Sequence, residues 1–254
     1  MTLLELQKTI IYGPVNSRRL GKSLGINLMP TSYKMCSFNC VYCQYGWTKT
    51  HTLEVSGYLP ALPTVDEVKK TLEDWLKKGQ KVDYITFSGN GEPSIHPEFD
   101  KIVDEVKKLR DKFQPQAKVA ILSNSSSLAL PWVKKALEML DVRIMKLDCG
   151  TSEAFEKINQ PATKIKYQDM IENLKDIKNI IIQSVFVRGD ISNTSTDEVE
   201  EWIEKIRYIS PDKVQIYSLD RPSAFKSLLK VDRYVLSKIA ELAQELSGIT
   251  VEVF

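Results

Sequence analysis

The stretch Cys36-Ser-Phe-Asn-Cys40-Val-Tyr-Cys43 places three of the four cysteines of this 254-residue chain within eight residues. Three thiolates on one short loop predict three ligands of a cubane [4Fe-4S] cluster, whose fourth iron is left without a protein ligand. An iron with an open position can bind a substrate or a cofactor, whereas an iron held by a fourth thiolate serves mainly in electron transfer. An aromatic residue, Tyr42, directly precedes the third cysteine.

A structural zinc site and a disulfide framework are the alternative interpretations of these cysteines. A structural zinc ion usually takes four ligands, often from two CxxC-like pairs. The remaining candidates, Cys149, His51 and His96, do not complete such a pattern. Disulfide bonds are disfavoured because the three cysteines are too close together to brace a fold. We interpret Cys149 as a small packing residue and His96 as a structural one.

The overall composition is that of an ordinary globular protein, with 43% apolar and 27% charged residues. The net charge of +2 gives no global electrostatic argument for a nucleic-acid partner, although a local basic patch remains open. No segment has the apolar length of a signal peptide or a membrane span, so we expect a cytoplasmic protein without a membrane partner. The length allows one barrel-sized domain or two small ones.

Short apolar runs alternate with amphipathic helical stretches along the chain. The predicted strands are 23–29, 84–88, 117–123, 143–148, 180–187 and 213–218. The predicted helices are 65–78, 97–112, 130–140, 167–177, 196–208 and 232–246, followed by a short apolar run at 250–254. A capping-box pattern at Thr64 and Glu67 starts the first helix. This alternation predicts an α/β fold with parallel strands, either a doubly wound sheet or a partial barrel.

In both architectures a ligand binds at the carboxyl ends of the strands, and polar residues follow the predicted strands. The second strand leads into Ser88-Gly-Asn-Gly-Glu-Pro93, whose glycines let the backbone approach a ligand closely. The third leads into Ser123-Asn124-Ser125. For Asn124, a ligand contact and a helix N-cap are both open interpretations.

The fourth strand ends in Lys146 and Asp148, which share one side of the strand because side chains alternate. We expect them to pair inside the barrel, either as a functional group or as an internal ion pair, because either charge alone would be costly there. The fifth strand carries Gln183 and Ser184 in an apolar run, and these buried polar groups need partners.

The sixth strand places Gln215 and Tyr217 on one face and ends in Asp220-Arg221-Pro222. Arg221 is expected either to bind a carboxylate or phosphate, or to pair with Asp220 or another acidic neighbour. Near the N-terminus, the run from Tyr12 to Gly25 holds three basic residues among glycines and serines. That run is open to interpretation as an anion site or as a solvated loop.

The cysteine loop resembles the signature CxxxCxΦC, with Φ aromatic, of radical S-adenosylmethionine (SAM) enzymes. The run GPVxSRRLGxSLGI, the motifs GNGEP, KLD and DRP, and FxKINxP at 155–161 together resemble one subgroup of that superfamily. Its members are related to the wyosine-synthesis enzymes, which build a tricyclic base on tRNA. The additional N-terminal cysteines and the flavodoxin-like domain found among those enzymes are absent from this sequence.

The resemblance implies the partial (β/α)6 TIM-like barrel of the radical SAM type. It also implies one domain, 1–254, with an N-terminal extension at 1–22, a barrel core at 23–220 and a C-terminal helix and strand at 221–254. In the superfamily the open iron chelates SAM, and an electron from the cluster cleaves SAM to methionine and a 5′-deoxyadenosyl radical. The implied function is hydrogen abstraction from an unidentified substrate, with a tRNA base or another macromolecule as candidates and flavodoxin or ferredoxin as reductant.

The implied cluster ligands are Cys36, Cys40 and Cys43. The implied SAM-binding positions are Tyr42, Gly89, Asn90, Gly91, Glu92, Asn124, Gln183 and Ser184. Our candidates for substrate or proton handling are Lys146, Asp148, Gln215 and Arg221. Two other function classes remain open: a radical activase or peptide-modifying radical SAM enzyme, and a non-catalytic Fe-S redox protein or zinc protein.

Overall fold

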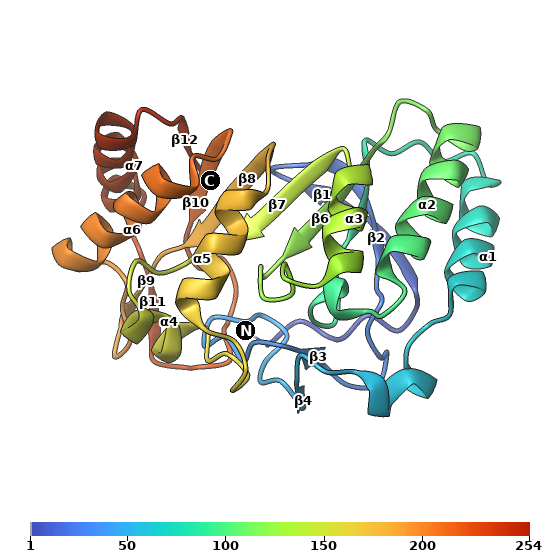
Figure 1. The fold of residues 1–254 in the computed structure, drawn as a ribbon, viewed down its shortest axis with the longest axis horizontal. Helices are drawn as coiled ribbons and strands as arrows, with labels where there is room; N and C mark the ends of the chain where they lie inside the picture. The colour runs from blue at the N-terminus through green and yellow to red at the C-terminus, as the bar shows by residue number, and fades with distance from the viewer. Residues whose placement is uncertain (1) are drawn as a thin grey trace.

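A curved eight-stranded sheet forms the centre of the computed structural model, which describes residues 2–254 (Figure 1). Its strands lie in the order β1-β2-β5-β6-β7-β8-β10-β12. They are β1 (Ile11–Ser17), β2 (Gly21–Ile26), β5 (Tyr84–Phe87), β6 (Lys118–Ser123), β7 (Val142–Lys146), β8 (Ile180–Val185), β10 (Lys213–Tyr217) and β12 (Val251–Val253). β1 is antiparallel to β2, and the strands from β2 to β12 are parallel to their neighbours. The parallel strands therefore share one carboxyl edge.

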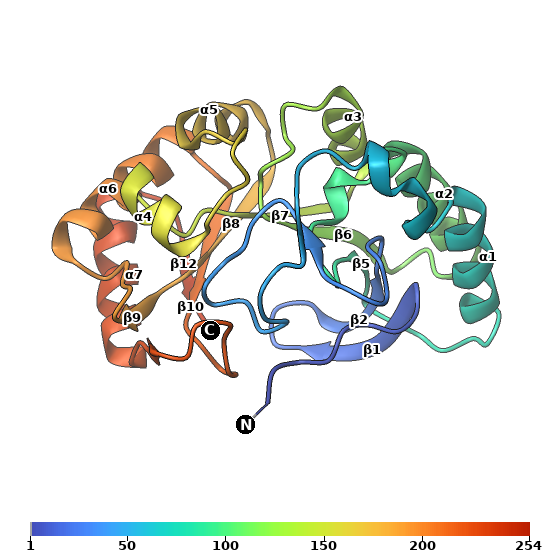
Figure 2. The ribbon, with the colours of Figure 1, turned by 90° about the horizontal axis from the view of Figure 1, so that it is seen from below.

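Helices cover the outer face of this sheet, as Figure 2 shows. They are α1 (Val65–Leu76), α2 (Phe99–Phe113), α3 (Pro131–Met139), α5 (Tyr167–Asp176), α6 (Thr196–Ile209) and α7 (Arg233–Ser247). Each parallel strand is added beside the previous one, so the crossovers pass over the same face. A doubly wound sheet would reverse its strand order and carry helices on both faces. The predicted α/β partial barrel is therefore confirmed, and the doubly wound alternative is excluded.

The six predicted strands correspond to β2, β5, β6, β7, β8 and β10, with ends shifted by at most three residues. The run at 250–254 contains β12, which adds one more parallel strand at the edge. The sequence pattern does not predict β1, because Pro14 and an irregularity between Tyr12 and Val15 interrupt it. Proline is tolerated there because β1 is an edge strand. The limits of the domain at residues 22 and 220 stay predictions.

The first predicted helix begins at the predicted residue, Val65. At the start of α1 the amide of Thr64 donates to the Glu67 carboxylate (2.7 Å), and the Glu67 amide donates to the Thr64 hydroxyl (3.2 Å). The predicted capping box is confirmed. The short helix α4 (Ser152–Ile158) was not predicted, because only its FxKIN residues were recognised as a motif.

The loops that carry the site lie within the arc of strands (Figure 2). After β2 come the short strands β3 (Met35–Cys36) and β4 (Thr50–His51), which pair with each other, and the 3-10 helix η1 (Ser56–Ala61). A second 3-10 helix, η2 (Pro93–Ile95), follows β5, and β9 (Val187–Gly189) pairs with β11 (Leu228–Lys230). In the described chain β1 and β12 pair with one sheet neighbour each, so the barrel stays open between them. Among residues 2–254 no helix combines the length and the apolar character that crossing a bilayer requires.

Candidate active site

The three clustered cysteines lie on a loop that distant segments hold in place. Cys36 is buried at the end of β3. The amide of Val41 donates to the carbonyl of Ile158 at the end of α4 (2.9 Å), and the amide of Ala224 donates to the carbonyl of Cys43 (3.1 Å). The thiols form no disulfide bonds. Backbone contacts to two remote segments therefore fix the loop.

Polar side chains act on all three cysteines. Asn124 Nδ2 donates to Cys36 Sγ (3.5 Å) and Asn159 Nδ2 donates to Cys40 Sγ (3.6 Å), while the Lys34 ammonium acts on Cys43 through its charge. Lys34 is only 5% exposed, and its ammonium also donates to the carbonyl of Gly46 (2.9 Å). Hydrogen bonds of this kind orient sulfur ligands and tune the metal that they bind.

The protonation of this loop is set by burial and by the Lys34 charge. Burial raises the pKa of Cys36 to about 12 and that of Cys40 to about 11, so these free thiols are protonated at neutral pH. Burial alone would lower the pKa of Lys34, but Cys43 and the other two cysteines raise it above its ordinary value. A bound metal deprotonates coordinating thiols outright, and the resulting negative charge would face a buried cation.

The donor set fits a cluster better than a single ion. No three His, Cys, Asp or Glu side chains within residues 2–254 converge on a position for one metal ion. A cubane cluster spreads three thiolates over three different irons, so its ligands lie farther apart than the ligands of one zinc ion. Three thiols, each with a polar partner, are consistent with the cluster ligands that the sequence predicts.

The turn after β5 packs directly against the cysteine loop. A methyl group added at Gly91 would lie 1.6 Å from the carbonyl oxygen of Met35, and the residue has a φ of +153°. Gly89 lies against Asn27 in a similar way. The amide of Met35 donates to the carbonyl of Asn90 (3.1 Å). The turn and the loop are therefore one packed unit.

The side chain of Asn90 does not face this unit. It accepts a hydrogen bond from the amide of Gln7 (2.7 Å) and donates to the carbonyls of Gln7 and Pro30, both at 2.9 Å. These contacts tie down the N-terminal segment. The prediction of a SAM contact at Asn90 is therefore limited to its backbone.

Glu92 is buried at the end of the same turn. Its carboxylate accepts hydrogen bonds from the amide of Asn124 (2.6 Å) and from the amide and hydroxyl of Ser94. Burial raises the pKa of Glu92, and the hydrogen bonds from Asn124 and Ser94 oppose that effect. The carboxylate thereby links the loops that follow β5 and β6. Its predicted contact with the SAM ammonium group stays a prediction.

The loop after β6 approaches the cluster loop through Asn124. Its amide nitrogen Nδ2 donates to the hydroxyl of Ser37 (2.9 Å) and lies near Cys36, as described above. The alternative of a helix N-cap is wrong, because α3 begins seven residues later with Leu130 as its cap. Ser125 has a φ of +69° and donates to the carbonyl of Lys146 (2.9 Å).

Lys146 and Asp148 form the ion pair that strand alternation predicts, with 2.7 Å between the ammonium and the carboxylate. Asp148 also accepts hydrogen bonds from Tyr42 Oη, Asn159 Nδ2 (2.8 Å) and the amide of Val185 (2.9 Å). Burial raises the pKa of Tyr42 well above its ordinary value, so its phenol stays protonated and donates. The ion pair therefore contacts the cysteine loop through the aromatic residue of the signature.

Gln183 and Ser184 point in opposite directions. Gln183 is paired in register with Lys146 and donates to Gln215 Oε1 (3.4 Å). Ser184 contacts the helical side, where its hydroxyl donates to the carbonyl of Leu147 and accepts from the indole of Trp202 (3.1 Å). Of these neighbours only Gln183 lies on the face of the ion pair, and the SAM contacts of Gln183 and Ser184 stay predictions.

Tyr217 joins this face, whereas Arg221 does not. The ammonium of Lys146 donates to the Tyr217 hydroxyl (3.1 Å). The Arg221 side chain is exposed and has no ion pair within the described chain. The expected pairing of Arg221 with Asp220 is wrong, because Asp220 pairs with Arg18 and Lys230 (2.8 Å) instead.

Sequence reasoning missed two residues that contact the cysteines, Lys34 and Asn159. Asn159 is the asparagine of the FxKIN motif, which was recognised without a role. Lys34 carried no signal beyond its position two residues before Cys36. Two structural interpretations agree with the structure: Cys149 is buried and lies 3.6 Å from Asn159 Oδ1, and His96 contacts the carbonyl of Pro63 (2.9 Å).

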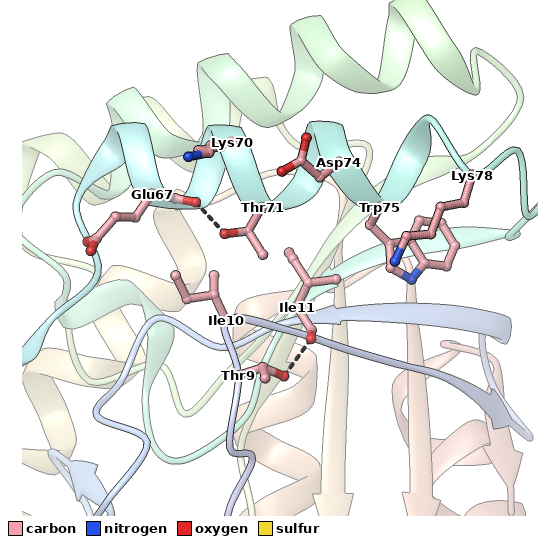
Figure 3. A pocket seen from close by; sticks show the side chains of 9 residues that line it. All are labelled: Thr9, Ile10, Ile11, Glu67, Lys70, Thr71, Asp74, Trp75 and Lys78. Atoms are coloured by element: carbon pink, nitrogen blue, oxygen red, sulfur yellow. Dashed lines mark hydrogen bonds between the residues drawn. The ribbon is translucent and has the colours of Figure 1, made fainter.

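A shallow crevice between α1 and residues 9–11 lies outside this site (Figure 3). Its polar groups are used locally: Thr71 donates to the Glu67 carbonyl (2.7 Å), and Thr9 donates to the Ile11 carbonyl (2.7 Å). The crevice is lined by no cysteine or histidine.

Comparison with known protein families identifies the superfamily of this chain. The family model described as "Radical SAM superfamily" matches residues 31–206, which include the cysteine loop, the Gly89–Glu92 turn and the Lys146–Asp148 pair. The chain belongs to the radical SAM superfamily. The predicted recognition is confirmed, and radical SAM proteins are enzymes that use SAM with an iron-sulfur cluster.

Two relatives match most of this chain and differ in how much of their own length the match covers. The UPF0026 protein of Methanocaldococcus jannaschii is 31% identical over 246 residues, covering 94% of this chain and 73% of the relative. The protein named GTPase Obg from Brachyspira hyodysenteriae is 33% identical over 224 residues, covering 87% of this chain. This chain spans only 31% of the length of the Brachyspira protein.

Solved radical SAM structures share the fold. A radical SAM methyltransferase from Sphaerobacter thermophilus superposes with a TM-score of 0.65 at 14% identity, covering 91% of this chain and 65% of the methyltransferase. A structure of TYW1 with a bound lysine-pyruvate adduct superposes with a TM-score of 0.54 at 15% identity, covering 89% and 74% of the two chains. At these identities the likeness establishes the shared partial barrel.

Proposed function

We propose that this protein binds a [4Fe-4S] cluster through Cys36, Cys40 and Cys43 and reductively cleaves SAM, so that the 5′-deoxyadenosyl radical abstracts hydrogen from a substrate. The observation that carries this proposal is the packing of the cysteine loop against the Gly89–Glu92 turn, with a polar partner at each sulfur. Membership of the radical SAM superfamily supports the same chemistry.

The surrounding residues have separate tasks in this proposal. The backbone at Tyr42 and the Gly89–Glu92 turn cradle the adenine and the methionine ammonium of SAM. Asn124 and Gln183 contribute further polar contacts to SAM. Asn124 and Asn159 also hold the sulfur ligands in place, and Lys34 offsets their negative charge. A reduced flavodoxin or ferredoxin supplies the electron.

Lys146 and Asp148 are proposed to hold protons at the substrate side of the cluster loop. Burial alone would lower the pKa of Lys146, but Asp148 and Tyr217 raise it, so the ammonium stays charged. The pair also positions Tyr42 through its phenol. We propose a tRNA base as the substrate, supported by the resemblance of the sequence motifs to the wyosine-synthesis subgroup.

The proposal is tested by anaerobic reconstitution with iron and sulfide, followed by dithionite reduction with SAM and chromatography for 5′-deoxyadenosine. The wild-type protein is expected to hold four irons per chain, as a cubane cluster requires, and to form the product. Cys40→Ala is expected to lose the cluster and product formation, because one of three ligands is gone.

Cys149→Ala is the matched control. This cysteine is buried outside the triplet and offers only a weak S–H donor to Asn159. Its alanine variant is expected to keep the iron content and the product. The proposal fails if Cys40→Ala retains full iron and forms 5′-deoxyadenosine, or if both variants lose iron equally.

A further inference from the structure

The turn between β1 and β2 crosses the open side of the barrel and reaches the opposite edge of the sheet. Arg18 forms an ion pair with Asp220, which lies just beyond β10. The guanidinium carbon of Arg19 lies 4.5 Å from the centre of the Tyr217 ring and 5.6 Å from that of Phe254. Two consecutive arginines therefore bridge parts of the sheet that do not pair with each other.

These two arginines differ in how their charges are compensated. The Arg18 side chain is 58% exposed and has a carboxylate partner. Arg19 is half-buried, and its Nη1 atom is fully buried without a hydrogen-bond partner among residues 2–254. Burial lowers the pKa of Arg19, and the charge of Arg18 lowers it further, against the opposing effect of Tyr217 and Asp220. A buried donor without an acceptor costs free energy.

The carboxylate that acts on Arg19, Asp220, and the acidic residues of the neighbouring strands already have basic partners. The pairs are Asp148 with Lys146, Asp220 with Arg18 and Lys230, and Glu252 with Lys213. No carboxylate of the described chain lies within ion-pair distance of Arg19. Its positive charge is therefore available to a ligand.

Tyr217 connects Arg19 to the candidate catalytic residues. The Lys146 ammonium donates to the Tyr217 hydroxyl (3.1 Å) and lies 4.8 Å from the centre of the same ring. Lys146 in turn pairs with Asp148, which accepts a hydrogen bond from Tyr42 of the cysteine loop. An anion held by Arg19 would lie beside this chain of contacts, at the open side of the barrel. Stacking on an aromatic ring also fixes the plane of a guanidinium group.

We propose that Arg19 binds an acidic group of the substrate, a carboxylate or a phosphate, with Tyr217 as the surface that orients the guanidinium. The proposal rests on the proposed function, since it names the chemical class of the substrate at that site. The forked donors of arginine match the two oxygens of either acid. An acidic substrate would then be anchored next to Lys146 and Asp148.

Isothermal titration calorimetry under anaerobic conditions tests this site. The reconstituted protein is saturated with SAM, so that the open iron is not available to the probes. It is titrated with inorganic phosphate, acetate or neutral acetamide at one ionic strength set with chloride. Phosphate or acetate is expected to bind saturably and acetamide is not. Binding of phosphate alone assigns a phosphate-bearing substrate, and binding of acetate alone assigns a carboxylate.

Arg19→Gln is expected to weaken anion binding about 10- to 100-fold, as the loss of a charge-assisted hydrogen bond does. Arg18→Gln is the matched control. It is expected to change the affinity for the anion less than about threefold, because an exposed charge that is already paired contributes little to binding. Arg19→Lys keeps the charge and lacks the forked donors, and it is expected to weaken binding by about tenfold. Arg19→Lys serves as the test variant if Arg19→Gln does not fold.

The inference is overturned if neither anion binds the wild-type protein, or if Arg18→Gln weakens binding as much as the Arg19 variants. The binding readout does not need SAM cleavage. A protein that forms 5′-deoxyadenosine without Arg19-dependent anion binding overturns this inference alone. A protein that binds anions through Arg19 and does not cleave SAM overturns the proposed function alone.

Discussion

Replacing Asp148 with alanine is expected to destabilise the protein by about 3–5 kcal/mol, the cost of breaking a buried ion pair. The Asp148 side chain is 0% exposed, and that of its partner Lys146 is 14% exposed, so the ammonium left behind would have little access to water. The amide of Val185 and the side chain of Asn159 would lose their acceptor at the same time. Anaerobic chemical denaturation of the reconstituted variant measures the loss.

The double variant Lys146→Met/Asp148→Ala separates the charge from the packing. Removing both charges is expected to recover much of the loss, because no uncompensated cation remains. The loss of an exposed surface pair lowers the free energy of unfolding by less than about 1 kcal/mol. A loss that small in Asp148→Ala would contradict the burial of the ion pair. A double variant as unstable as Asp148→Ala would assign the loss to the hydrogen bonds of Asp148 instead of the ion pair.

Gly91→Ala is expected to destabilise the protein by more than about 3 kcal/mol, since backbone strain and steric overlap act together. The added methyl would lie 1.6 Å from the Met35 carbonyl oxygen, which is a backbone atom and cannot turn away. Met35 directly precedes Cys36, and a β-bridge joins it to Gly91. The variant is therefore expected to lose bound iron as well as stability, as iron analysis and denaturation would show.

Gly79→Ala is the matched control for this variant. Gly79 also has a positive φ, +73°, but a methyl group there meets nothing within 4 Å. Its cost is expected to be about 1 kcal/mol, from backbone strain alone, with the iron content unchanged. Equal losses in the two variants would contradict the close approach of the turn to the cysteine loop.

The parts of this fold that the sequence predicts are those set by local chemistry. Parallel strands with flanking helices follow from the alternation of apolar runs, and Thr64 with Glu67 marks the start of α1. The Lys146–Asp148 pair follows from side-chain alternation along one strand. The same rule shows that the neighbours Gln183 and Ser184 point to opposite faces of their strand.

The parts that the sequence did not predict depend on contacts between distant segments. An ion pair between Arg221 and Asp220 was one of the two interpretations of the sequence. Asp220 instead pairs with Arg18, about two hundred positions away in the chain, across the open side of the barrel. Asn159 reaches Cys40 only because the end of α4 packs on the cysteine loop. No local pattern encodes such contacts, since they arise only when distant segments meet in the folded chain.

The electron paramagnetic resonance spectrum of the reduced, reconstituted protein, recorded with and without SAM, tests the central claim most directly. A cluster held by Cys36, Cys40 and Cys43 leaves one iron free to bind SAM. The reduced wild-type protein is therefore expected to give a cluster signal that changes when SAM is added, and Cys40→Ala is expected to give no such signal. A cluster signal that SAM leaves unchanged would contradict the account.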